Sequence, residues 1–105
     1  MAEATPGLDH ALAGDRLLAQ GQFAQAFEAY ASALQAQPHN VYWRFLAGES
    51  LFHLGRYADT VDLLHDLDPG ADTTLAIEHA LTLGRALQLT GQITAAVMQL
   101  IKPCM

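Results

Sequence analysis

Three segments decide the fold: GDRLLAQG (residues 14–21), GESLFHLG (48–55) and GRALQLTG (84–91). Each begins and ends with glycine, and successive segments start 34 and then 36 residues apart. Matched glycine pairs at one near-constant period indicate an internal repeat, and repeats of this length are typical of solenoids built from supersecondary units. The two extra residues fall in the stretch 68–73, whose composition is typical of a loop.

The residue pattern of each unit predicts two helices, separated by the second glycine of its pair. Thr5 is the expected N-cap of the first helix, Gly21 supplies the left-handed residue that ends it, and Asn40 and Thr74 are the expected starts of later helices. No segment alternates convincingly at period two, so we expect no strands. The expected helices cover residues 7–20, 23–37, 41–54, 57–67, 74–90 and 93–102.

The first glycine of each pair lies inside a predicted helix, where glycine costs about 1 kcal/mol relative to alanine. Its recurrence suggests close approach of the paired helix, with Ala26, Thr60 and Ala96 as the expected partners. Trp43 is expected to fill the seam between the first two units.

The pattern resembles the tetratricopeptide repeat family, whose 34-residue unit carries W-x₂-L-G-x₂-Y, then A-x₃-F, then P. Unit one has His10-x₂-Ala13-Gly14-x₂-Leu17, then Ala26-x₃-Tyr30, then Pro38. Units two and three match with Ala47-Gly48-x₂-Leu51 and Leu83-Gly84-x₂-Leu87, although the opening Trp is missing from all three. The resemblance implies an all-α solenoid of six antiparallel helices, in one domain over 1–105 with repeats at about 7–40, 41–74 and 77–105.

The amino-acid composition argues against several classes of binding partner. Eleven acidic residues oppose five basic ones, Lys102 is the only lysine, and the arginines are scattered singly. This argues against binding nucleic acid or an anionic membrane surface. No run approaches the ~18 apolar residues of a membrane span, so we expect no membrane insertion. The first residues, MAEATPGLDHALAGD, lack the features of a secretory signal, and the single cysteine, Cys104, fits a reducing compartment, so we expect a cytoplasmic protein.

The sequence gives little support for catalytic activity. The five histidines show no metal-binding spacing, and His65 with Asp62, Asp66 and Asp68 is more simply explained as a solvated helix end than as a metal site. Cys104 has no positioned base in the sequence around it. We therefore expect no enzyme activity, no cofactor and no metal.

A second stripe on the first helices is the candidate binding site. In the tetratricopeptide repeat family the first helices line the concave face, which implies an apolar and aromatic groove with charged residues along its middle. The same stripe would also suit core packing, and the sequence leaves both interpretations open. The candidate groove residues are Leu8, Asp15, Leu18, Tyr42, Phe45, Glu49, Phe52, His53, Leu81, Arg85 and Leu89.

The resemblance implies a non-catalytic protein-interaction module that binds a peptide or helix of a partner protein. Asp15 and Glu49 would repel an acidic tail, so an apolar or amphipathic segment with a basic residue is the better partner. The alternative is a bacterial secretion-type chaperone that holds an apolar segment of a secreted substrate. The expected last helix, 93–102, leaves Ala95 and Met98 outside its inward face, which predicts a two-fold homodimer through this end unless the array continues beyond it.

Overall fold

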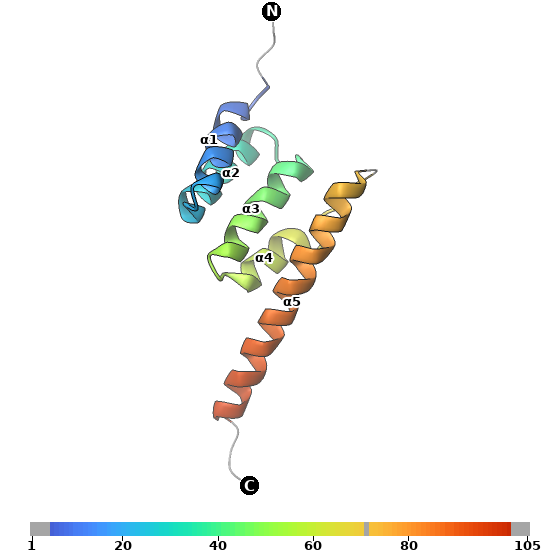
Figure 1. Ribbon diagram of the computed structural model, residues 1–105. Coiled ribbons are helices and arrows are strands. Elements are labelled where there is room, and N and C mark those ends of the chain that lie inside the picture. The colour runs from blue at the N-terminus through green and yellow to red at the C-terminus, as the bar shows by residue number, and fades with distance from the viewer. Residues whose placement is uncertain (1–4, 71, 102–105) are drawn as a thin grey trace, which may run out of the picture.

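The protein is an elongated stack of antiparallel helices, with extents of 72 × 29 × 21 Å (Figure 1). The computed structural model describes residues 5–70 and 72–101, with side chains described as far as residue 91. These residues form five helices and no strand: α1 (Leu8–Ala19), α2 (Phe23–Ala36), α3 (Val41–His53), α4 (Tyr57–Leu64) and α5 (Thr73–Ile101). The all-α repeat architecture is confirmed.

The prediction of six helices is wrong, because the last two are one. Gly21 and Gly55 end α1 and α3 at φ 77° and 81°. The next residues, Gln22 and Arg56, donate their N–H groups back to Leu17 and Leu51. Gly91 stands at the same place in the third unit, yet α5 runs straight through it. Glycine permits the left-handed conformation without requiring it, so the same residue stands in a turn in units one and two and inside a helix in unit three.

The helix starts were predicted with mixed success. Asn40 caps α3 as expected, since its Oδ1 accepts from the N–H of Trp43 at 3.0 Å. Thr5 does not cap α1; Gly7, at φ 83°, takes that position without a side-chain hydrogen bond. Asp72 caps α5 by accepting from the N–H of Leu75 at 2.9 Å, so this helix begins one residue before Thr74. Aspartate is among the preferred N-cap residues, because its side-chain oxygen accepts a hydrogen bond from a free N–H in the first turn of the helix.

Asn40→Ala is expected to lower the free energy of unfolding by about 1 kcal/mol, because it leaves an N–H at the start of α3 without its acceptor. Urea unfolding of this variant beside His39→Ala, an exposed neighbour without such a hydrogen bond in the structure, measures the difference. Equal stability of the two variants would refute the capping role.

The glycines inside the first helices are sites of close approach in units one and two. A Cβ on Gly14 would lie 2.8 Å from the Tyr30 ring, and one on Gly48 would lie 2.7 Å from the Leu64 side chain. The expected small partners also lie in the interior: Ala26 is fully buried, and Thr60 donates its hydroxyl to the Gly48 carbonyl at 3.2 Å. Ala96 lies outside the residues whose side chains are described.

Two side chains of α3 join the repeats. Trp43 is buried against Ala11 of α1 and Ala33 of α2, which confirms its predicted place in the seam between units one and two. Phe45 packs against Leu64 of α4, Leu67 beyond it and Leu75 of α5. Because α3 contacts both neighbouring units, it carries buried residues on several sides.

Candidate binding surface

Helix α3 lies between α1 and α5 in the stack (Figure 1), so one side of the molecule presents residues from these three first helices. Tyr42 on α3 is 54% exposed, and Ile77 and Leu81 on α5 are 56% and 64% exposed. These values are high for large apolar side chains. On α1, Leu8 and Leu12 are 39% and 45% exposed, so all three of these helices carry exposed apolar side chains.

Acidic residues lie on the same three helices, with Asp15 on α1, Glu49 on α3 and Glu78 on α5. The Tyr30 hydroxyl reaches from α2 and donates to Asp15 Oδ1 on α1 at 2.6 Å. Burial raises the pKa of Tyr30, and the hydrogen bond to Asp15 raises it further, with smaller contributions from Glu49 and Tyr42 on α3. The tyrosine therefore keeps its proton, and it holds Asp15 close to α3.

Glu49 connects this group to α5. Burial raises the pKa of Glu49 above its usual range; His53 lowers this pKa, while the charge of Glu78 on α5 raises it. The Glu49 carboxylate is 3.8 Å from His53 Nε2. We define the acidic–apolar surface as the following residues of α1, α3 and α5: Asp15, Tyr42, Glu49, Ile77, Glu78 and Leu81.

One predicted groove residue is in the core. Phe45 is 2% exposed, so no ligand reaches it without unpacking α3 from α4 and α5. Its assignment as a groove residue is therefore corrected. Phe45 lies three residues after Tyr42 on the same helix. Because other helices pack on several sides of α3, two residues only three apart differ in exposure: Tyr42 faces solvent and Phe45 faces the core.

The remaining predicted residues are distributed along the stack. Leu18 is half-buried beside the cluster of Ala26, Tyr30 and Ala47. His53 is exposed and stacks on Phe23 with ring centroids 4.7 Å apart, while Phe52 packs against Tyr57 at 5.4 Å. These two side chains of α3 thus contact second helices. Leu8 and Arg85 are exposed, and Leu89 is half-buried.

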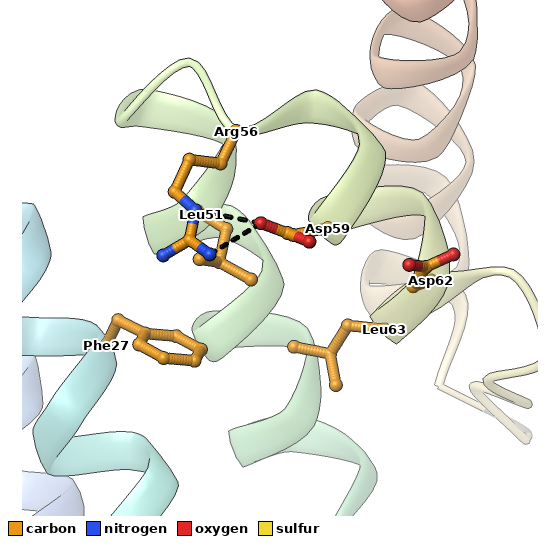
Figure 2. Close-up of a pocket in the computed structure, with 6 residues that line it drawn as sticks. All are labelled: Phe27, Leu51, Arg56, Asp59, Asp62 and Leu63. Carbon is orange, nitrogen blue, oxygen red and sulfur yellow. Dashed lines mark hydrogen bonds and ion pairs between the residues drawn. The ribbon is translucent and has the colours of Figure 1, made fainter.

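A pocket that the sequence did not predict opens between α2 and α4, with a volume of about 300 Å³. Figure 2 shows its apolar residues together with the ion pair at its rim. Arg56 Nη2 lies 2.7 Å from Asp59 Oδ2, so the charges at this rim already neutralise each other. The three-residue spacing of this pair was the available sequence signal. The lining residues are Phe27, Leu51, Arg56, Asp59, Asp62 and Leu63.

Among the described residues, no three His, Cys, Asp or Glu side chains gather in a group that could hold a metal ion. The Nδ1 of His65 lies 3.1 Å from the Val61 carbonyl oxygen and 3.0 Å from that of Asp62, so this ring faces backbone. Within the same part of the chain, no helix has the length and apolar character needed to cross a membrane, α5 included.

The comparisons with known proteins fit this architecture. No curated protein and no solved structure gives a significant match to the chain. The family model described as "Tetratricopeptide repeat" matches residues 12–70, which is more than half of the chain and includes α2, α3 and α4. Proteins of this family generally act in protein–protein interaction and not in catalysis. On this match and on its helical repeat architecture, the chain belongs to the tetratricopeptide repeat family.

Proposed function

We propose that this chain is a non-catalytic interaction module that binds an amphipathic peptide or helix of a partner protein along the acidic–apolar surface. The observation that carries the proposal is the exposure of Tyr42 and Leu81 on α3 and α5, the helices whose Glu49 and Glu78 lie close enough for their charges to interact. Exposed aromatic and aliphatic side chains that lose water on binding supply much of the affinity of such interfaces.

The charges of this surface select the partner's chemistry. Glu49 is partly withdrawn from water and lies near the like charge of Glu78, and both features raise its pKa. A Lys or Arg of the partner placed beside Glu49 would relieve this repulsion. The preferred ligand therefore combines apolar residues at helical or extended spacing with at least one basic residue.

Selection from a displayed library of random peptides tests this function, because such a selection requires no identified partner. Peptides enriched on the wild-type chain are expected to be apolar and to contain Lys or Arg. Tyr42→Ala with Leu81→Ala should weaken their binding by about 2 kcal/mol or more, roughly thirtyfold in Kd.

The matched control is Leu54→Ala, which removes an exposed leucine in the turn after α3. It should leave the affinity unchanged. Acidic consensus peptides, or equal losses of affinity in the double variant and the control, would contradict the proposed surface.

Glu49→Gln is expected to change stability and binding in opposite directions. Because the pKa of Glu49 is higher in the folded chain than in the unfolded chain, the folded state holds this proton more tightly. Its stability therefore falls as pH rises from the usual glutamate pKa to the folded value, and the ionised group costs stability at neutral pH. Glu49→Gln should raise the free energy of unfolding at pH 7 and lose this advantage under acidic conditions.

The same substitution should weaken the binding of a basic peptide by about 1 kcal/mol, roughly a fivefold increase in Kd. Urea unfolding at two pH values and titration with a selected peptide measure the two effects. Glu28→Gln, on an exposed site of α2, is the control. A Glu49→Gln chain that is less stable at pH 7, or that binds the basic peptide more tightly, would contradict this role of Glu49.

A further inference from the structure

One face of α5 lacks the cover that the corresponding faces of α1 and α3 have. Tyr30 fills the space over Gly14 and Leu64 fills the space over Gly48, whereas no described atom lies within 4 Å of a Cβ placed on Gly84. Three residues further on, Leu51 of α3 is 4% exposed while its repeat counterpart Leu87 is 52% exposed. The third unit therefore has the notch of a repeat without the helix that fills it.

This bare face is distinct from the side of α5 that packs on the stack. Leu75 and Ala86 are buried, and His79 Nε2 lies 2.7 Å from the Leu64 carbonyl oxygen, so they mark the side that contacts α4. The bare face consists of residues at spacings of four, three and four, all of them exposed: Ala80, Gly84, Leu87 and Gly91.

The repeat register identifies the segment that fits the notch. Tyr30 and Leu64 each follow their glycine by sixteen residues, and the residue sixteen after Gly84 is Leu100. In the first two units a turn at Gly21 or Gly55 brings the second helix back over the first. In α5 the helix continues to Ile101, so positions 84 and 100 of one chain are about 24 Å apart along its axis. The chain cannot fill its own notch in this conformation.

The composition of α5 also favours a second copy of this helix as the segment that covers the bare face. Between Ala80 and Ile101 the sequence contains a single charged residue, Arg85. A helix this poor in charge normally lies against another apolar surface. Two antiparallel copies would bring position 84 of each beside position 100 of the other, with residue 92 at the centre, and this pairing places no like charges opposite one another.

We propose that two copies of this chain form a two-fold dimer in which residues 93–101 of each α5 cover the bare face of the other. The partner subunit's Leu100 then occupies the notch at Gly84, as Tyr30 and Leu64 occupy those of units one and two. The interface is the intramolecular contact of a repeat, made between chains by exchange of its second helix. Its residues on α5 differ from those that define the acidic–apolar surface, and its test does not depend on the function proposed for that surface.

Light scattering during size-exclusion chromatography, with reductant present, tests the dimer. The wild-type chain should be a dimer at concentrations on the order of tens of micromolar. Gly84→Leu fills the notch and should give a monomer that keeps its helical circular dichroism, because leucine favours helix over glycine and meets no described neighbour there. Thr74→Leu, a change to the same residue at an exposed position in the first turn of α5 and outside the proposed contact, should remain a dimer. A monomeric wild type, or a Gly84→Leu chain that stays dimeric, would overturn the proposal.

A disulfide distinguishes exchange from a helix that folds back within one chain. A chain with Gly84→Cys, Leu100→Cys and Cys104→Ser should form disulfide-linked dimers on oxidation, visible on a non-reducing gel. Gly84→Cys with Cys104→Ser alone should not. An intramolecular disulfide, which would show the segment folding back at Gly91, contradicts the exchange, and so does the absence of any disulfide.

Discussion

Phe45→Ala is expected to lower the free energy of unfolding by about 3–5 kcal/mol, the usual cost of emptying a buried phenylalanine site. Phe45 is the side chain at which α3, α4 and α5 meet, through Leu64, Leu67 and Leu75. Its loss removes apolar burial and leaves a cavity that the helices close only in part. Urea unfolding at one fixed protein concentration measures the change.

Tyr42→Ala is the matched control, because it removes an aromatic side chain from the same helix at a position that is 54% exposed. Its effect on stability should stay within about 0.5 kcal/mol, as at most surface sites. A Phe45→Ala chain as stable as Tyr42→Ala would show that Phe45 is not a core residue, and would return it to the candidate groove.

Gly48→Ala is expected to destabilise the chain by about 1–3 kcal/mol, although alanine is the better helix former by about 1 kcal/mol. The new Cβ would lie 2.7 Å from two carbons of the Leu64 side chain, and Leu64 is fully buried in a cluster with Phe45, Leu67 and Leu75. Steric overlap therefore outweighs helix propensity at this position.

A double-mutant cycle with Leu64→Ala isolates that overlap. Without the leucine branches, Gly48→Ala should be neutral or stabilising, so the coupling between the two positions should be at least about 1 kcal/mol. If Gly48→Ala lowers the free energy of unfolding equally with Leu64 and with Leu64→Ala, the glycine is not required because of its contact with Leu64.

The sequence predicted the repeat and most of its helices, and tertiary packing explains where that prediction failed. The glycine period located four of the five helices to within about three residues at either end. Gly21, Gly55 and Gly91 are equivalent in sequence, but only the first two have returning helices whose packing stabilises the turn. The sequence could not show that the third turn is replaced by a straight helix, because that choice depends on tertiary packing.

The binding surface was only partly predictable for a related reason. Helix α3 lies between other helices and carries apolar residues on several faces, so its stripes do not separate core from surface. Tyr42 and Phe45 were therefore indistinguishable by spacing, although one is exposed and the other buried. Ile77 was missed, while its position four residues before Leu81 was the available signal.

Backbone chemical-shift mapping of the isotope-labelled chain with a library-selected peptide tests the proposed binding surface most directly. The largest shifts are predicted to fall on α1, α3 and α5, around Asp15, Tyr42, Glu49 and Leu81, and to be lost in the Tyr42→Ala, Leu81→Ala chain. Shifts centred on Phe27, Asp59 and Asp62, which line the pocket between α2 and α4, would contradict the proposed surface.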